Sequence, residues 1–383
     1  MPGDMSRWLV LLALASCATA PSADLAPGEN PAPGSTEANL WMAMDRVETQ
    51  LQASGQVVRD PALDAYLVEI VCRLEPERCH NVRIYVVDVP HFNASMAPNG
   101  VMQVWTGLLL RTENEAQLAF VLSHELAHYV RRHSLQRWID VQNKANAASI
   151  FALVTSAAGI GYAGDIGALA ALASIMAFSR DQEREADTLG LQRAAEAGYD
   201  PHEGARIWRA LRAEQAASEA RERLVFLSTH PGVDERIRTL EVAAQAVPDA
   251  VNRTVAPGRL AAVTAPYLDE WLGDELTRGA YGESEVLFDR LLERRYEPSL
   301  IQFYRGELYR KRNEPGDLDR AVSAYEAAIA TDPTAARAHR GLGQVLIRLG
   351  ADARARAALR RYVELAPEAP DRLMIEEQIK SPR

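Results

Sequence analysis

The sequence predicts an α+β protein: a mostly helical domain with a small β-sheet, followed by an all-α domain of helical repeats. Helical patterns surround residues 112–128 and 179–197, and a β-branched run at 82–89 precedes a hairpin pattern. Towards the C-terminus, similar residues recur 34 positions apart. The 383 residues allow two or three domains with ample core. A net charge of −10 makes nucleic acid a poor candidate partner.

The first residues have the composition of a targeting segment. An apolar run at 8–14 is too short to span a membrane as a mature helix, and the Leu-Ala-Ser-Cys that follows resembles a bacterial lipobox ending at Cys17. We therefore expect a lipoprotein signal peptide at 1–16 and a lipidated Cys17. Ala18 beside it resembles sorting to the outer membrane of Gram-negative bacteria. The alternative is cleavage three residues later, but this would leave Pro21 after the cut, which signal peptidase tolerates poorly.

Residues 17–38 are rich in Ala, Pro, Gly and Ser and cannot bury a core, so we expect a lipidated cysteine followed by a flexible tether. The folded part is expected to begin near residue 39. Two helices are predicted, at 40–51 and 60–74. The second is entered through Asp60, an N-cap residue followed by proline.

Cys72 and Cys79 flank a short polar segment after the second helix. Outside the cytoplasm, two close cysteines favour a disulfide over a redox or metal pair. A buried strand is predicted at 82–89. A hairpin then follows, with strands at 93–97 and 101–105 joined by a Pro-Asn-Gly turn.

The first chemical motif is His124-Glu125-Leu126-Ala127-His128. Histidines four residues apart lie on one face of a helix, so both imidazoles can bind one metal ion. Glu125 can then reach a water bound to that metal. The residues from Thr112 to Glu115 have the pattern of a capping box that starts this helix.

The second motif, Ser179 to Asp187, is acidic and also helical. A catalytic zinc takes three protein ligands and leaves one position for water. Glu183 and Asp187 are four residues apart and share a face. One carboxylate can bind the metal while the other accepts the free N–H of a ligating imidazole. On its own, this run is more typical of a solvated helix surface.

Together, His-Glu-x-x-His and the downstream Glu-x-x-Ala-Asp resemble the HtpX/BepA-type zinc metallopeptidases, family forty-eight of the metallopeptidases. The resemblance covers roughly residues 55–245 and implies a zincin-like metallopeptidase domain, which we place at 39–250. It implies one Zn²⁺ per chain, with the following roles: His124, His128 and Glu183 as ligands, Glu125 as general base, and Asp187 as the carboxylate behind a ligand. In zincin-like proteases, an edge strand such as the predicted hairpin pairs with an extended substrate. A strand covered by helices is the alternative.

Between the two motifs, residues 145–178 form two apolar runs rich in Ala and Gly. Membrane-embedded relatives carry transmembrane hairpins near this position. These runs are short and poor in Leu and Ile, so we expect two packed helices beside the cleft.

A further segment, Ser228-Thr229-His230-Pro231 with Arg236 downstream, also resembles the family. His230 and Arg236 are the candidates to stabilise the oxyanion. His230 has a second interpretation as a fourth imidazole that closes the zinc site. In a third interpretation it is merely exposed at the start of a helix. Of the two functional roles, we favour the closing imidazole.

The C-terminal third contains an internal repeat. Ala321, Tyr325, Ala328 and Pro333 are matched 34 residues later by Ala355, Leu359, Tyr362 and Pro367. This pattern resembles tetratricopeptide repeats, so we predict such a domain at 265–383, with Gly343 allowing paired helices to approach closely. Stacked repeats provide a surface that can hold another chain.

The sequence thus predicts a zinc endopeptidase held at the periplasmic side of an outer membrane by its lipid anchor. Its expected substrates are unfolded or misassembled envelope proteins, and the repeats are expected to hold substrate or to dock on the outer-membrane assembly machinery. The main alternative is an envelope scaffold or chaperone lipoprotein that acts through its repeats. A membrane-embedded protease is a third possibility.

Overall fold

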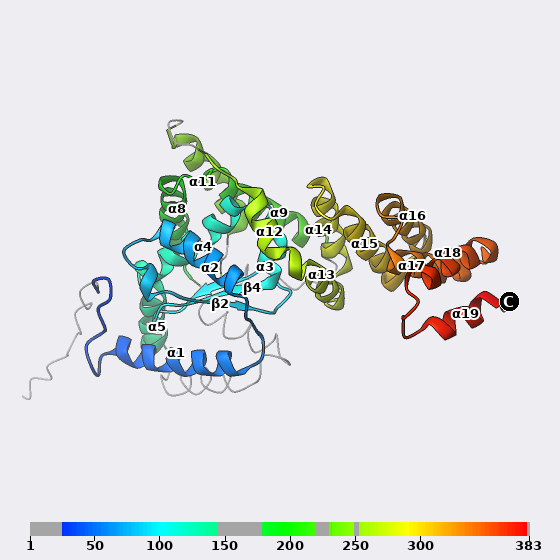
Figure 1. Cartoon of the computed structure of the whole chain (residues 1–383). Coiled ribbons are helices and arrows are strands. Elements are labelled where there is room, and N and C mark those ends of the chain that lie inside the picture. Colours follow the sequence, from blue (N-terminus) through cyan, green and yellow to red (C-terminus); the bar gives the residue numbers. More distant parts are fainter. Residues whose placement is uncertain (1–24, 145–177, 219–229, 231, 249–252, 381–383) are drawn as a thin grey trace, which may run out of the picture.

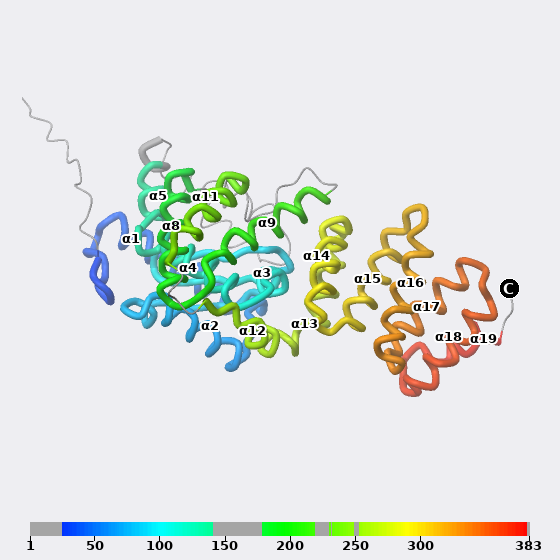
Figure 2. Tube along the Cα trace, turned by 90° about the horizontal axis from the view of Figure 1, so that it is seen from above, coloured from blue at the N-terminus to red at the C-terminus, as the bar shows by residue number. Residues whose placement is uncertain are grey.

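The protein is described from a computed structural model that covers residues 25–144, 178–218, 230, 232–248 and 253–380. The fold is mostly helical with one small sheet and a C-terminal helical array, which confirms the predicted class. The sheet lies within the N-terminal body, and the array extends from it as an arm that ends at the C-terminus (Figure 1). The same arm is seen from above in Figure 2.

The N-terminal body contains all four strands and most of the longer helices. The strands are β1 (Val57–Val58), β2 (Arg83–Val87), β3 (Ala94–Met96) and β4 (Val101–Trp105). The helices are α1 (Thr36–Ala53), α2 (Pro61–Leu74), α3 (Thr106–Arg111), α4 (Glu115–Val130), α5 (His133–Lys144), α8 (Arg180–Glu196), α9 (Glu203–Ala216), α11 (Val233–Ala246) and α12 (Pro257–Thr264). Short 3₁₀ turns occur at η1 (Cys79–Asn81) and η2 (Ala265–Tyr267).

The sheet has the order β1-β2-β4-β3, so β3 is an edge strand. β2 and β4 are parallel, whereas β3 and β4 form the predicted antiparallel hairpin. Alternate residues face opposite sides of the sheet. Val86 and Val104 therefore join the main core with α2 and α4, while Val87 and Trp105 pack with Leu51 of α1. The sheet is covered on both faces.

Helix α2 begins as predicted. The Asp60 side chain accepts hydrogen bonds from the Ala62 and Leu63 amides, and proline occupies the first helical position. Cys72 and Cys79 form a disulfide with a Cα–Cα distance of 4.8 Å, which confirms that pairing. The bond ties the end of α2 to the turn before β2.

Helices α4 and α8 carry the two predicted motifs and pack against each other. At Gly190 of α8, an added Cβ would lie 3.0 Å from the backbone nitrogen of His124, so the small residue permits this close approach. Ser179 and Gln182 cap α8 reciprocally. The predicted capping box of α4 is wrong by two residues, because Asn114 caps this helix by accepting from the Gln117 amide.

The C-terminal array consists of successive antiparallel helices: α13 (Leu268–Thr277), α14 (Tyr281–Glu293), α15 (Pro298–Arg312), α16 (Asp317–Thr331), α17 (Ala336–Arg348), α18 (Asp352–Leu365) and α19 (Arg372–Lys380). The repeated residues Ala321, Tyr325, Ala355 and Leu359 are all buried between helices. At Gly343, an added Cβ would lie 2.4 Å from the Leu359 side chain, as expected for a close helix pair.

Two N-terminal features bear on the predicted boundaries. Helix α1 begins at Thr36, before the expected start near residue 39, and residues 25–35 contain hydrogen-bonded turns. In the part of the chain that the structure describes, no helix is long and apolar enough to cross a membrane. The targeting segment with Cys17 and the apolar runs at 145–177 lie outside the described residues.

Candidate metal centre

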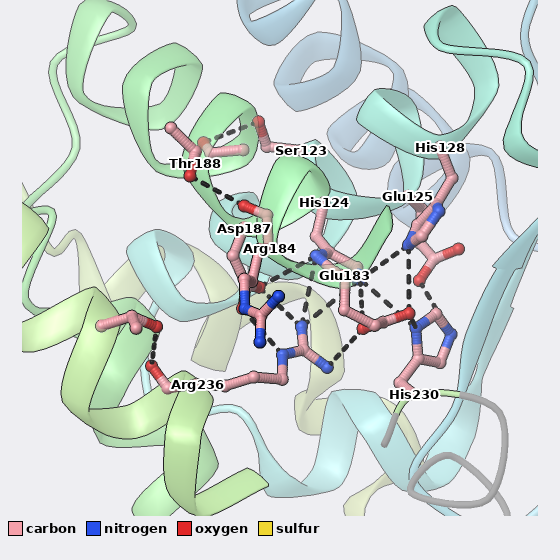
Figure 3. A network of polar contacts seen from close by, with 12 residues as sticks. Ser123, His124, Glu125, His128, Glu183, Arg184, Asp187, Thr188, His230 and Arg236 are labelled. Atoms are coloured by element: carbon pink, nitrogen blue, oxygen red, sulfur yellow. Dashed lines mark hydrogen bonds and ion pairs between the residues drawn. The ribbon is translucent and has the colours of Figure 1, made fainter. Parts of the chain in front are cut away.

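Four ligand-bearing side chains from three places in the sequence converge on one point. His124, His128, Glu183 and His230 are all buried, and their ligand atoms lie within 4.8 Å of one another (Figure 3). His124 Nε2 is 3.1 Å from His128 Nε2 and 3.3 Å from His230 Nδ1. The Glu183 carboxylate is 2.9 Å from His230 Nδ1 and 3.6 Å from each of the other two imidazoles.

His124 is oriented from behind by a carboxylate and an arginine. Its Nδ1 lies 3.1 Å from Asp187 Oδ1, so Nδ1 carries the proton and Nε2 presents its lone pair to the cluster. Arg236 donates to both oxygens of Asp187, at 2.8 and 2.6 Å, and lies 3.0 Å from Glu183. Its guanidinium also rests 4.1 Å from the ring of Trp208. Arg236 is therefore engaged in holding the two carboxylates.

These contacts set the charge states of the carboxylates. Burial opposes ionisation of Asp187, but Arg236 and the hydrogen bond from His124 more than offset it and lower its pKa to about 2. Burial likewise opposes ionisation of Glu183, and the nearby His230 and Arg236 bring its pKa below the usual value. Burial, helped by Arg236, lowers the pKa of His124 to about 4. The cluster thus combines anionic carboxylates with neutral imidazole.

His128 is oriented by His133, a contact that the sequence analysis missed. The two Nδ1 atoms are 2.9 Å apart, and His133 Nε2 lies 3.3 Å from Glu185. His133 therefore donates to Glu185 and accepts from His128, which leaves His128 Nε2 free to face the cluster. Phe178 stacks on the other side of His128, with ring centroids 3.9 Å apart.

Glu125 lies beside the cluster, between His230 and the edge strand. Its Oε1 is buried, is 3.7 Å from His230 Nε2 and has no hydrogen-bond partner among the described residues. Burial raises the pKa of Glu125 to about 7. The nearby His230 and Arg236, and a hydrogen bond from the Met96 backbone in β3, partly oppose this rise. A carboxylate with such a pKa can take up and release a proton near neutral pH.

The donor set fits a bound metal ion. The Nε2 atoms of His124 and His128 both present lone pairs at 3.1 Å, and a cation between them removes their repulsion. Two or three imidazoles with one carboxylate is a combination that binds zinc and other first-row divalent metals.

The structure brings together every described residue of the predicted site. His124, His128 and Glu183 lie in the cluster, Glu125 lies beside it, and Asp187 lies behind His124. His230 is 3% exposed, which contradicts the interpretation that it is merely exposed.

A helix carrying His-Glu-x-x-His, a second helix supplying a glutamate and an adjacent edge strand define a metallopeptidase domain. The sequence model of peptidase family M48 matches residues 58–244, and that of a tetratricopeptide repeat matches residues 314–370. The N-terminal body of this chain thus belongs to peptidase family M48 and is followed by tetratricopeptide repeats.

Curated relatives include both bacterial and mitochondrial enzymes. The chain is 33% identical over 159 residues to the mitochondrial metalloendopeptidase OMA1 of Schizosaccharomyces pombe, an alignment covering 41% of this chain and 45% of the relative. It is 30% and 28% identical to the beta-barrel assembly-enhancing proteases of Yersinia pestis and Escherichia coli. These two alignments cover 57% of this chain and 46% and 47% of the relatives. The chain thus spans less than half the length of each of the three.

Proposed function

We propose that this chain is a zinc-dependent endopeptidase of the bacterial cell envelope that degrades misfolded or stalled periplasmic and outer-membrane proteins. The observation that carries the proposal is the convergence of His124, His128 and Glu183 next to the buried carboxylate of Glu125, whose Oε1 has no hydrogen-bond partner among the described residues. A structural zinc site is normally closed by four ligands and has no need of such a base. The names of the bacterial relatives support the assignment to envelope proteins.

In the proposed mechanism, His124, His128 and Glu183 would hold a zinc ion, which would supply the Lewis acidity needed to polarise a scissile carbonyl and to acidify the attacking water. Glu125 takes the proton from that water as it attacks, and then passes it to the leaving nitrogen. The substrate adds to β3 as an extended strand, since β3 is the sheet edge and Met96 at its end adjoins Glu125. Recognition through main-chain hydrogen bonds suits substrates of many sequences.

The test is Glu125→Gln, which keeps the side-chain shape and removes the base. We expect zinc content to remain at one per chain while casein cleavage falls by about 100-fold or more. Glu196→Gln is the matched control, because Glu196 is an exposed residue at the end of α8. Normal cleavage by the Glu125 variant with zinc still bound would refute the proposed role.

We further propose that His230 restrains the enzyme as a fourth ligand in the position that the attacking water needs. Its Nδ1 lies 3.3 Å from His124 Nε2 and 2.9 Å from Glu183, distances that suit a shared metal ion. His230→Ala should then raise basal proteolysis. A strong loss of activity with zinc retained would instead assign His230 to stabilising the oxyanion.

The remaining features of the proposal concern location and partners. We propose that Cys17 anchors the mature chain to the outer membrane and that the repeats hold substrate or dock on the outer-membrane assembly machinery. Cys17→Ser should release the protein from membranes or block its processing, as read by fractionation and mass spectrometry. The alternative is a scaffold or chaperone lipoprotein that acts through its repeats. It predicts that Glu125→Gln fully complements a strain lacking this protein.

A further inference from the structure

A cavity of about 310 Å³ adjoins the metal cluster. His128 and the residues after it in α4 form one wall, and the β3–β4 turn at Pro98 and Asn99 forms another. A third wall comes from residues 25–30 and the start of α1, which lie outside the segment matched by the peptidase family. The cavity is thus completed by a part of the chain that the family match does not assign.

The N-terminal wall has a defined shape. Residues 26–29 form a turn in which the Glu29 amide donates to the Ala26 carbonyl at 3.0 Å, and the Glu29 side chain accepts from the Ala26 amide at 2.9 Å. Helix α1 is fixed to the sheet, because Glu48 receives two hydrogen bonds from Arg83, at 2.7 and 2.8 Å. Because these contacts hold the wall in place, it can restrict which substrate side chains enter the cavity.

The cavity lies where an extended substrate would continue past Glu125. Met96 at the end of β3 adjoins Glu125, and Pro98, two residues further along the same hairpin, lines the cavity. A strand advances about 3.3 Å per residue. A polypeptide that pairs with β3 therefore reaches the cavity within about two or three residues of the scissile bond.

Several polar side chains in the wall have unused hydrogen-bonding capacity, including the buried Trp41 Nε1 and Asn81 Oδ1. The partly buried Tyr129 and the exposed His80 also line the cavity, and neither the Tyr129 hydroxyl nor the His80 ring has a hydrogen-bond partner among the described residues. A phenol and an imidazole can each donate or accept, so together they match an amide or a hydroxyl group.

The basic side chains around the cavity are all neutralised. All four arginines in its lining are paired with a carboxylate: Arg78 with Glu75, Arg83 with Glu48, Arg131 with Glu185, and Arg132 with Glu37. The lining also contains Glu29, which is exposed and has no basic partner among the described residues. An acidic side chain would therefore lose hydration here without a free basic group to compensate. A basic side chain would meet only the exposed carboxylate of Glu29, where an ion pair contributes little.

We propose that this cavity is a substrate subsite of the peptidase, which holds a neutral polar side chain, an amide or a hydroxyl, through Tyr129 and His80. The inference rests on the proposed proteolytic function and specifies the substrate class that the site selects. The side chain belongs to the substrate residue that lies about two or three positions from the scissile bond.

The experiment uses the zinc-loaded full-length protein and a set of casein-derived peptides that differ at one position at a time. Each position within about four residues of the cut carries Gln, Met, Glu or Lys in turn. At one position, we expect kcat/KM for Gln to exceed that for the similarly sized Met by about 3- to 10-fold, the effect of one or two hydrogen bonds. Glu and Lys should be cleaved no better than Met.

Tyr129→Phe keeps the ring and removes the hydroxyl, so it should lower kcat/KM for Gln peptides more than for Met peptides and abolish most of the Gln preference. Tyr281→Phe is the matched control. Its hydroxyl also has no hydrogen-bond partner among the described residues, and it lies in α14 rather than in the cavity wall. Equal losses for Gln and Met peptides, an unchanged preference, or better cleavage of Glu or Lys peptides would overturn the proposal.

A binding measurement separates this proposal from the proposed activity. Labelled Gln and Met peptides are titrated with Glu125→Gln, with and without Tyr129→Phe, and followed by fluorescence anisotropy. If Gln peptides bind more tightly in a Tyr129-dependent way while the wild-type chain cleaves nothing, the subsite stands and the proposed activity fails. If the wild-type chain cleaves casein but the peptide affinity depends neither on Gln nor on the Tyr129 hydroxyl, only the subsite proposal fails.

Discussion

Arg111 offers the sharpest test of how the body and the array are joined. This residue ends α3, and its guanidinium is fully buried between the two parts. Nε donates to Glu214 of α9 at 2.7 Å, and Nη2 donates to both oxygens of Glu275 in α13 at 2.9 Å. Replacing it by Met keeps most of the apolar volume and removes the charge.

The size of the effect follows from the partners that remain. Removing one member of a buried ion pair typically costs about 3–5 kcal/mol. Glu214 keeps Arg290 at 3.0 Å, and Glu275 keeps Arg278 at 2.6 Å together with a hydrogen bond from Ser284 at 2.9 Å. We therefore expect Arg111→Met to lower the free energy of unfolding by about 3 kcal/mol, at the low end of that range.

The assay is urea denaturation of the zinc-loaded protein, followed by circular dichroism. Arg361→Met is the control, because Arg361 forms an exposed pair with Glu364 and should cost less than about 1 kcal/mol. Combining Arg111→Met with Glu214→Gln and Glu275→Gln should recover much of the loss, since Arg278 keeps Glu283 at 2.7 Å and Arg290 keeps Glu113 at 3.3 Å. A cost for Arg111→Met as small as that of the control would refute the reasoning.

The same cluster predicts a pH dependence. Burial opposes ionisation of Glu275, but Arg111 and Arg278 more than offset it, so its pKa lies below the ordinary 4.5. A carboxyl with a lowered pKa in the folded state contributes stability at neutral pH that is lost as the pH falls below 4.5. The Arg111→Met variant should lose less stability than the wild type in this window. An equal loss in both would show that Arg111 does not set this pKa.

Three further predictions concern the metal, the disulfide and the repeats. Glu183→Ala should abolish stoichiometric zinc binding, whereas Asp187→Ala should weaken it by about 10–100-fold. The reverse order would make Asp187, one helical turn further along α8, the zinc ligand in place of Glu183. Cys72→Ser should lower stability by about 2–3 kcal/mol in denaturant, and equal stability of oxidised and reduced wild type would contradict this. Gly343→Ala should cost about 1–3 kcal/mol through overpacking, whereas Gly258→Ala, which meets no atom within 4 Å, should be neutral or stabilising.

The metal cluster could be predicted because its signals are local. Spacing of four residues places His124 and His128 on one face, and the same spacing aligns Glu183 with Asp187. The cap at Asp60 was equally visible, since it satisfies amides two and three residues away.

The parts that the sequence analysis missed depend on the path of the backbone. Thr112 has the expected residue type for a cap, but its hydroxyl donates back to the Leu109 carbonyl, and Asn114 caps the helix instead. His133 reaches His128 only because Arg132 adopts a left-handed conformation, with φ of 55°, between α4 and α5. No residue pattern in the sequence predicts this left-handed residue between the two helices.

The joint between the body and the array is the clearest case of information that local patterns lack. Arg111 and Glu275 are 164 residues apart, yet their side chains meet without solvent. In a sequence, each reads as an ordinary charged position on a helix. Only the docking of α13 against α3 turns them into a buried pair.

This joint also acts on the start of the metal-binding helix. From α14, Arg294 donates to the Thr112 and Glu113 carbonyls, at 3.3 and 2.6 Å, and Arg290 donates to the Arg111 carbonyl at 3.3 Å. These three carbonyls belong to the link that leads directly into Asn114, the cap of α4. In addition, an added Cβ at Gly282 of α14 would lie 2.1 Å from the carbonyl of Ala217, so α14 also rests directly on the end of α9. Helices α13 and α14 are therefore part of the support of the peptidase, and the more independent repeats begin with α15.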